Sequence, residues 1–153
     1  MRMGAPVYYW DDLEAGLVFW GDTVVADRDE MLEYARKNDP QPIHIDEAAA
    51  LASPHKGLIA SGGYTISLWY RTSIPMLAEI AFIAGFDWHI RLPNPVRPGD
   101  MLRLKCQIVD RKPSSKPGRG TVSTEQVVMN QRAEAVMENK VVWMIAMRPS
   151  QLD

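Results

Sequence analysis

Hydrophobic and polar residues alternate along most of the second half of the chain. Such a period of two is typical of strands that bury one face and expose the other. The connections between the alternating segments are short, which favours antiparallel neighbours over the long crossovers that parallel strands need. The predicted strands cover residues 86–92, 101–109, 121–130 and 136–148.

One further strand and one helix are predicted near the start of the chain. Residues 16–26 are rich in β-branched and aromatic side chains, which favours a strand, and Gly21-Asp22 indicates a turn within it. Asp27 is followed three residues later by Glu30, a spacing that resembles a capping box. A helix is therefore expected over residues 28–37.

A long, mostly buried helix is predicted from an apolar segment that opens at Gly57. Its apolar and small residues recur at steps of three and four, and Pro75 is expected to kink or end it. Before it, Asp46 is expected to cap a short alanine-rich helix over residues 47–52. Two prolines within Asp39-Pro40-Gln41-Pro42 push the residues before them out of the helical region, so no helix is expected there.

These elements together predict the fold class. At 153 residues the chain is long enough for one domain with its own apolar core. A curved sheet that wraps a helix accounts for this order of elements, which is one strand, then a long buried helix, then four alternating strands. We predict an α+β fold, a single domain over residues 1–153 in which about five antiparallel strands surround the long central helix.

The composition excludes some classes of function. With 46% hydrophobic residues the chain is not predominantly disordered, and a net charge of −2 argues against nucleic acid or a membrane as partner. The charge is uneven, because residues 97–119 hold seven basic and two acidic side chains, a net +5. This stretch includes a basic loop at Arg111–Arg119, which either contacts ligand phosphates or is simply solvated.

The location of the protein is predicted from three absences in the sequence. A single cysteine excludes an internal disulfide framework and the common cysteine-rich zinc sites. The N-terminus shows no secretory signal pattern. The most apolar run, residues 74–86, is interrupted by Glu79 and is shorter than the roughly 20 residues of a membrane helix. A cytoplasmic protein is expected.

Asp39 and His44 are the candidate catalytic residues. They lie five positions apart around the two prolines. A straight strand would point them to opposite faces, and a helix would separate them by about 140°. A proline-stiffened bend can instead bring them together, and a carboxylate beside an imidazole suits general acid–base catalysis. Alternatively, Asp39 closes a helix and His44 is a hydrogen-bonded core histidine. His44, Asp46 and His55 match no metal-binding spacing, so no metal is predicted.

Small residues gather near the start of the long helix, at Ser61-Gly62-Gly63. They let a ligand approach the backbone closely, and the free N–H groups of a first helical turn can stabilise a developing oxyanion. Alternatively, the glycines only allow close packing. Further along, Arg71 is a charge on an otherwise apolar helix, expected to pair with a carboxylate or to face a partner chain.

These segments together resemble the MaoC-like dehydratase family, which includes the R-specific enoyl-CoA hydratases. The similarity runs from about Asp11 to Arg148. It rests on four pieces in this order: the run Asp39–Asp46, the helix start Ile59-Ala60-Ser61-Gly62, the loop Pro95–Asp100, and Asn130-Gln131 at a strand end.

The resemblance implies a hot-dog fold, homodimers or higher oligomers that join their sheets, and thioester substrates carried on coenzyme A, with no other cofactor. It places the family's catalytic pair on Asp39 and His44 and its oxyanion-binding glycine on Gly62. Ser61, Gly63 and Gln41 are expected at the substrate as well. These three differ from the better-studied hydratases, which have a histidine, a larger apolar residue and an asparagine there, so the acyl group is expected to differ.

The expected reaction is the reversible addition of water to a trans-2-enoyl-CoA, giving a 3-hydroxyacyl-CoA. Asp39 and His44 would hold the water, and the Gly62 N–H would stabilise the enolate that forms on the thioester oxygen. Two alternatives stay open. One is an acyl-CoA thioesterase on the same scaffold, and the other is a non-catalytic acyl-CoA-binding module.

Overall fold

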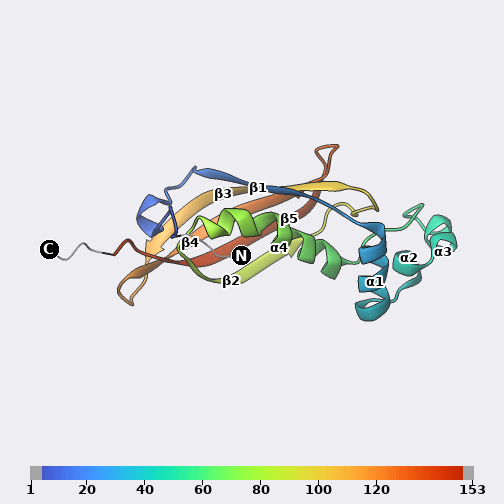
Figure 1. Cartoon of the computed structure of the whole chain (residues 1–153), viewed down its shortest axis with the longest axis horizontal. Coiled ribbons are helices and arrows are strands. Elements are labelled where there is room, and N and C mark those ends of the chain that lie inside the picture. The colour runs from blue at the N-terminus through green and yellow to red at the C-terminus, as the bar shows by residue number, and fades with distance from the viewer. Residues whose placement is uncertain (1–4, 150–153) are drawn as a thin grey trace.

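A computed structural model of the protein describes residues 5–149. Within them, five strands form one antiparallel sheet in the order β1-β3-β4-β5-β2. The sheet curves around the long helix α4 (Figure 1). The strands are β1 (Val18–Val25), β2 (Phe82–Arg91), β3 (Met101–Pro113), β4 (Arg119–Met129) and β5 (Ala135–Ala146). This is the predicted hot-dog arrangement, and the α+β prediction is confirmed.

The core lies between α4 (Gly62–Ala78) and the inner face of the sheet. Every second residue is buried in β4 and in β3 as far as Ile108, as the alternating pattern predicts, and the buried residues of β5 follow the same spacing along most of the strand. Helix α4 contributes Tyr64, Leu68, Trp69 and Met76 to the same core. Because α4 is covered by the sheet over most of its length, its first turn at one end of the sheet is fixed in position.

Three short helices group beyond that end of the sheet, beside the start of α4 (Figure 1). They are α1 (Arg28–Asn38), α2 (Pro42–Ile45) and α3 (Glu47–Ala52), while a single 3-10 turn, η1 (Trp10–Asp12), lies near the opposite end. Both predicted caps are present. The Asp27 carboxylate accepts from the Glu30 N–H at 2.9 Å, and the Asp46 carboxylate accepts from the Ala49 N–H at 3.0 Å.

Helix α2 corrects the prediction that the proline run excludes a helix. Pro42 is the first residue of this single turn, where a proline is tolerated because the N–H that it lacks has no partner within the helix. Gln41, the residue before it, stays extended with φ −73° and ψ 142°. Pro42 therefore keeps the residue before it, Gln41, out of the helical region, but it begins a helix of its own that carries His44.

The bounds of α4 also differ from the expectation. The helix begins at Gly62 rather than near Gly57, which has a φ of +148° that lies outside the helical region. Pro75 lies inside α4, and the helix continues to Ala78. In β1, the expected turn at Gly21-Asp22 is an irregularity in the pairing with β3, so the strand continues through it.

Candidate active site

Asp39 and His44 meet at the junction of α1 and α2. Asp39 ends α1 as its C-cap, and His44 lies on α2. The bend between the two helices brings Asp39 Oδ2 to 3.4 Å from His44 Nε2. The imidazole is buried, whereas a third of the Asp39 side chain is exposed. The pair therefore combines an enclosed nitrogen with a carboxylate that solvent or a ligand can reach.

The tautomer of His44 follows from its second hydrogen bond. Its Nδ1 lies 2.8 Å from the carbonyl oxygen of Ile59, which can only accept, so Nδ1 carries a proton and donates it. In the neutral ring Nε2 is then the unprotonated nitrogen, and it faces Asp39. The 3.4 Å distance leaves no room for a water oxygen between the two atoms, so they are close enough to share a proton directly. This is the arrangement that a general acid–base pair requires.

Gln41 orients the carboxylate rather than the imidazole. Its Nε2 donates to Asp39 Oδ1 at 2.8 Å, which leaves Oδ2 directed at His44. The amide thus fixes which oxygen of Asp39 is available for chemistry. The resemblance places a shorter asparagine at this position, and here the longer glutamine side chain reaches the carboxylate two residues back.

The first turn of α4 offers free backbone N–H groups. Ser61 is its N-cap, and the Ser61 hydroxyl accepts from the Tyr64 N–H at 3.3 Å. The N–H groups of Gly62 and Gly63 lie in the part of a helix that has no internal acceptors. The N-terminal end of α4 also carries partial positive charge, so these two amides suit a developing oxyanion.

The two glycines have different neighbours. A Cβ added at Gly62 would lie 3.0 Å from Leu92 Cδ1, so this position faces the strand end after β2. A Cβ added at Gly63 would overlap the hydroxyl of Tyr34, which packs from α1. Gly63 therefore permits the close contact between α1 and α4, one of the alternatives that the sequence left open.

One backbone segment connects the Asp39–His44 pair to the start of α4. Ile59 accepts from His44, and three residues later Gly62 begins α4. Ala60, between them, donates its N–H to the carbonyl of Val96 at 2.8 Å. Hydrogen bonds from His44 and to Val96 hold this segment in place. They therefore fix the position of the imidazole relative to the free N–H groups of α4.

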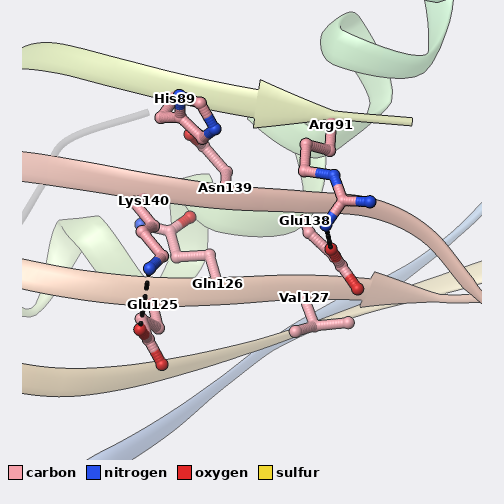
Figure 2. A pocket seen from close by; sticks show the side chains of 8 residues that line it. All are labelled: His89, Arg91, Glu125, Gln126, Val127, Glu138, Asn139 and Lys140. Carbon is pink, nitrogen blue, oxygen red and sulfur yellow. Dashed lines mark ion pairs between the residues drawn. The ribbon is translucent and has the colours of Figure 1, made fainter. Parts of the chain in front are cut away.

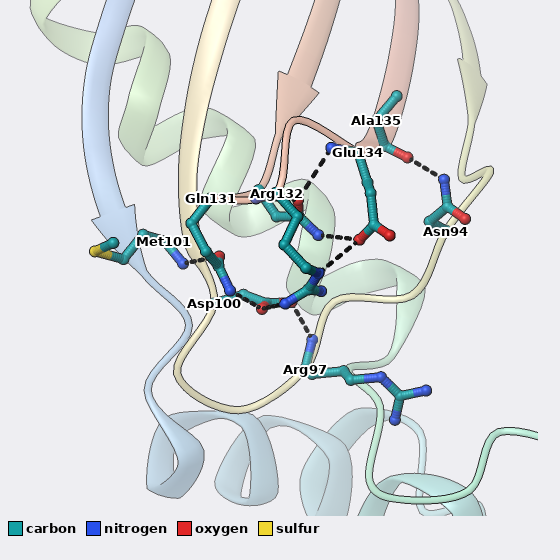
Figure 3. Close-up of polar contacts among 9 residues, drawn as sticks. Asn94, Arg97, Asp100, Met101, Gln131, Arg132, Glu134 and Ala135 are labelled. Atoms are coloured by element: carbon teal, nitrogen blue, oxygen red, sulfur yellow. Dashed lines mark hydrogen bonds and ion pairs between the residues drawn. The ribbon is translucent and has the colours of Figure 1, made fainter.

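The loop that carries Val96 is itself held by buried Asp100 (Figure 3). The Asp100 carboxylate accepts from the Arg97 N–H at 2.8 Å and from Gln131 Nε2 at 2.9 Å, and Arg132 lies at 3.6 Å. These contacts join the loop between β2 and β3 to the turn between β4 and β5. They explain why Pro95–Asp100 and Asn130-Gln131, far apart in sequence, both belong to the pattern that the sequence showed.

An apolar pocket lies beside the middle and the C-terminal part of α4. It has a volume of about 300 Å³ and lies between α4 and β2. Aromatic rings from both elements form its walls, and Trp69 and Trp88 meet edge to face with ring centroids 5.5 Å apart. Four of the pocket's aromatic residues, Trp69, Tyr70, Phe82 and Trp88, come from α4 and β2, and an aromatic residue in such an element cannot be told from a core residue by sequence pattern alone.

A charged cluster lies in the cleft between α1 and α4. Tyr64 donates its hydroxyl to Glu30 Oε2 at 2.9 Å, and Arg71 donates to the same oxygen at 2.7 Å. The hydrogen bonds from Arg71 and Tyr64 hold the pKa of Glu30 below its usual value, while burial and Glu30 raise the pKa of Tyr64. Arg71 therefore pairs with a carboxylate, one of the two outcomes that the sequence allowed.

The basic loop lies far from the catalytic pair. The hairpin that joins β3 to β4 is at the opposite end of the sheet from α1, α2 and α3 (Figure 1). Arg111 donates to the carbonyls of Trp10 and Asp11 and its guanidinium lies over the Trp10 ring, 4.7 Å from the centroid. This arginine fastens η1 to the sheet, which favours the interpretation of the loop as a solvated surface.

Sequence comparison places the chain in a family. The sequence model described as the MaoC like domain matches residues 20–130, a span that includes Asp39, His44, α4 and the Asp100 loop. The chain belongs to the MaoC-like dehydratase family. In residues 5–149 of this MaoC-like protein, no helix is both long and apolar enough to cross a membrane.

Known proteins similar to this MaoC-like chain cover nearly all of it. The curated protein YdeM of Bacillus subtilis, described as uncharacterized, is 28% identical over 137 residues, which are 86% of this chain and 94% of YdeM. The crystal structure of a MaoC-like dehydratase from Rhodospirillum rubrum is 31% identical with a TM-score of 0.84, covering 93% of this chain and 99% of that one. R-hydratase PhaJ1 from Pseudomonas aeruginosa shares the fold at 23% identity and a TM-score of 0.72, covering 92% and 86%.

Proposed function

We propose that this protein is a hydro-lyase that reversibly adds water to a trans-2-enoyl-CoA, with Asp39 and His44 as its acid–base pair. Membership of the MaoC-like dehydratase family supports hydratase or dehydratase chemistry in general. The observation that carries the specific proposal is the 3.4 Å approach of Asp39 Oδ2 to His44 Nε2, with His44 Nδ1 held by the carbonyl of Ile59. A similar fold in R-hydratase PhaJ1 agrees with this reaction class.

In the proposed hydration, a water molecule lies beside the 3.4 Å contact and forms hydrogen bonds to both Asp39 and His44. Its oxygen forms a bond to the β-carbon while one of its protons passes to the pair. The electrons of the carbon–carbon double bond move onto the thioester as an enolate, whose oxygen accepts from the Gly62 N–H. A proton from the pair then reaches the α-carbon and gives the 3-hydroxyacyl thioester. The proposal assigns neither Asp39 nor His44 alone as the proton donor or the acceptor.

The apolar pocket between α4 and β2 is the proposed site of the acyl chain. It begins within a few turns of Gly62 and is lined almost entirely by aromatic and aliphatic side chains, including Trp69, Tyr70 and Trp88. A thioester whose oxygen is bound at the helix start can extend its acyl chain along α4 into this pocket. Coenzyme A enters the proposal as part of the substrate, and the mechanism uses no other cofactor.

A substrate assay tests the reaction class. With crotonyl-CoA and longer trans-2-enoyl-CoAs, we expect the absorbance of the conjugated double bond to fall without release of free thiol. Thiol release from acyl-CoA would instead indicate a thioesterase, and binding without turnover would indicate a non-catalytic module. The thiol assay has little background from the protein, because Cys106 is buried and burial raises its pKa to about 12.

We also propose a homodimer in which β2 meets a second copy of the chain. Strand β2 lies at one edge of the sheet and carries large apolar side chains that are 37–48% exposed. These residues are Phe82, Ile83, Phe86 and Trp88. An unpaired edge with such side chains invites pairing, and a partner there would also cover the acyl pocket. Sedimentation analysis is expected to show a dimer, and a stable, active monomer would contradict the proposal.

A further inference from the structure

Asn139 is a buried amide whose hydrogen bonds are missing. Its side chain is 2% exposed, and within residues 5–149 neither its Nδ2 nor its Oδ1 has a hydrogen-bond partner. A buried polar group without a partner costs about 1–3 kcal/mol, so native proteins seldom retain one without a reason. A side chain with both a donor and an acceptor unused is suited to a ligand group.

The Asn139 side chain lies on the inner face of the sheet, in step with the buried Met137 and Val141. Its neighbours along β5, Glu138 and Lys140, point to the outer face, where they form ion pairs with Arg91 and Glu125 at 3.5 Å (Figure 2). Because side chains alternate along a strand, Asn139 faces the opposite way. It therefore cannot use these outer charges as partners.

The other polar groups on the inner face already bond to one another. Gln126, directly across from Asn139 on β4, accepts from Trp69 Nε1 at 2.7 Å and donates to Thr124 Oγ1 at 3.0 Å. Thr124 in turn donates to the carbonyl of Val141 at 3.1 Å. This chain of hydrogen bonds is complete without Asn139. The neighbouring polar side chains therefore have hydrogen-bond partners within the described part of the chain, and the Asn139 amide alone among them has none.

Asn139 lies between the candidate active site and the apolar pocket. On β2, Ile90 is paired with Asn139, and Leu92, two residues further, lies against Gly62. Two residues along a strand span roughly 6.6 Å and neighbouring strands lie about 4.8 Å apart, so the backbones of Asn139 and Leu92 are about 8 Å apart. Beyond Ile90, Trp88 and its partner Val141 line the pocket.

We propose that Asn139 binds a neutral hydrogen-bonding group, a hydroxyl or a carboxamide, on the acyl chain beyond the reacting double bond. The inference rests on the proposed enoyl-CoA function and narrows its substrate class. Such groups both donate and accept, so one of them satisfies both atoms of the amide. A carboxylate is excluded, because no cationic side chain among the described residues shares the inner face with Asn139, and a buried charge without a partner is costly.

Two saturated acyl-CoAs test the proposal by binding alone. Glutaramoyl-CoA ends in a carboxamide, and δ-methylhexanoyl-CoA has the same shape but ends in two methyl groups. Calorimetric titration of the full chain is expected to give an affinity about tenfold or more higher for the carboxamide. Equal affinities, as expected where only water occupies the position, or a preference for the apolar ligand would overturn the proposal.

The variant Asn139→Leu keeps the size of the side chain and removes its polar atoms. We expect it to reverse the preference between the two ligands and to melt at a higher temperature than the wild type, because two unsatisfied atoms are removed. Lys140→Leu, one residue away on the outer face, is the matched control and should keep the wild-type preference. If Asn139→Leu lowered the affinity for both ligands equally, the residue would have only a structural role, which would contradict the proposal.

The binding experiment stays separate from the test of hydration. Saturated ligands have no double bond to hydrate, so their affinities are measured whether or not enoyl-CoAs turn over. A thiol assay on the same samples detects hydrolysis. Hydration of crotonyl-CoA with equal affinities for the two ligands would refute the role of Asn139 alone. A tenfold preference without any turnover would refute the hydratase and retain the polar acyl site.

Discussion

Replacing Asp39 by Asn is expected to lower kcat for enoyl-CoA hydration by about 10²–10⁴-fold, the usual contribution of a general acid–base group. The amide keeps the shape of the carboxylate and its place beside Gln41 but cannot exchange the proton. The affinity for a saturated acyl-CoA should change little, because the loss concerns the reacting groups. Initial rates from the enoyl absorbance measure the effect.

His44→Asn should cause a loss of similar size. Its amide nitrogen can still donate to the carbonyl of Ile59, so the backbone before α4 stays held while the reactive Nε2 is absent. His89→Ala, on the outer face of the sheet, is the matched control and should retain full activity. Because the pair acts as a unit, the double variant should be little worse than either single one. Full turnover in both single variants would remove the pair from the mechanism.

Gly62→Pro is the second prediction with a large effect. Proline lacks the N–H assigned to the oxyanion, and loss of one such donor typically costs about 10²–10³-fold in kcat. The backbone accepts proline here, because Gly62 is the first residue of α4 and Ser61 before it is extended with φ −63° and ψ 151°. The variant is therefore expected to fold, which circular dichroism and thermal melting check.

Gly62→Ala separates the missing N–H from the added bulk. It keeps the donor but places a Cβ against Leu92, as proline also does. We expect Gly62→Ala to lose far less activity than Gly62→Pro, and the double variant with Leu92→Ala to recover most of that loss. Equal activities for the proline and alanine variants would show that this N–H does not stabilise the transition state.

Most of the fold could be predicted from the chain because its patterns are local. The alternation in β3 and β4 and the caps at Asp27 and Asp46 follow from the side chains themselves. The start of α4 could not be located, because Gly57–Ser61 is as apolar and small as a buried helix. It is held extended by tertiary hydrogen bonds, such as that from Ala60 to Val96.

The candidate site was predicted only in part, for a related reason. Asp39 and His44 lie in one short segment, so its prolines revealed the bend that joins them. The role of Gln41 in orienting the carboxylate and the contact of Gly63 with Tyr34 depend on distances that the sequence does not contain. Asn139 gave no signal at all, since a polar residue in an alternating strand is expected on the exposed face. Only burial shows that it is turned inward.

Asp39 and His44 lie within a group of three short helices outside the sheet, between β1 and α4 in the chain. In the proposed enzyme, mutations in this group can abolish turnover while the sheet and its core remain intact. Over evolution, the reaction and the architecture are then free to diverge at different rates. Two descendants with superimposable strands can differ in their acid–base residues, which lie in one short segment of the chain.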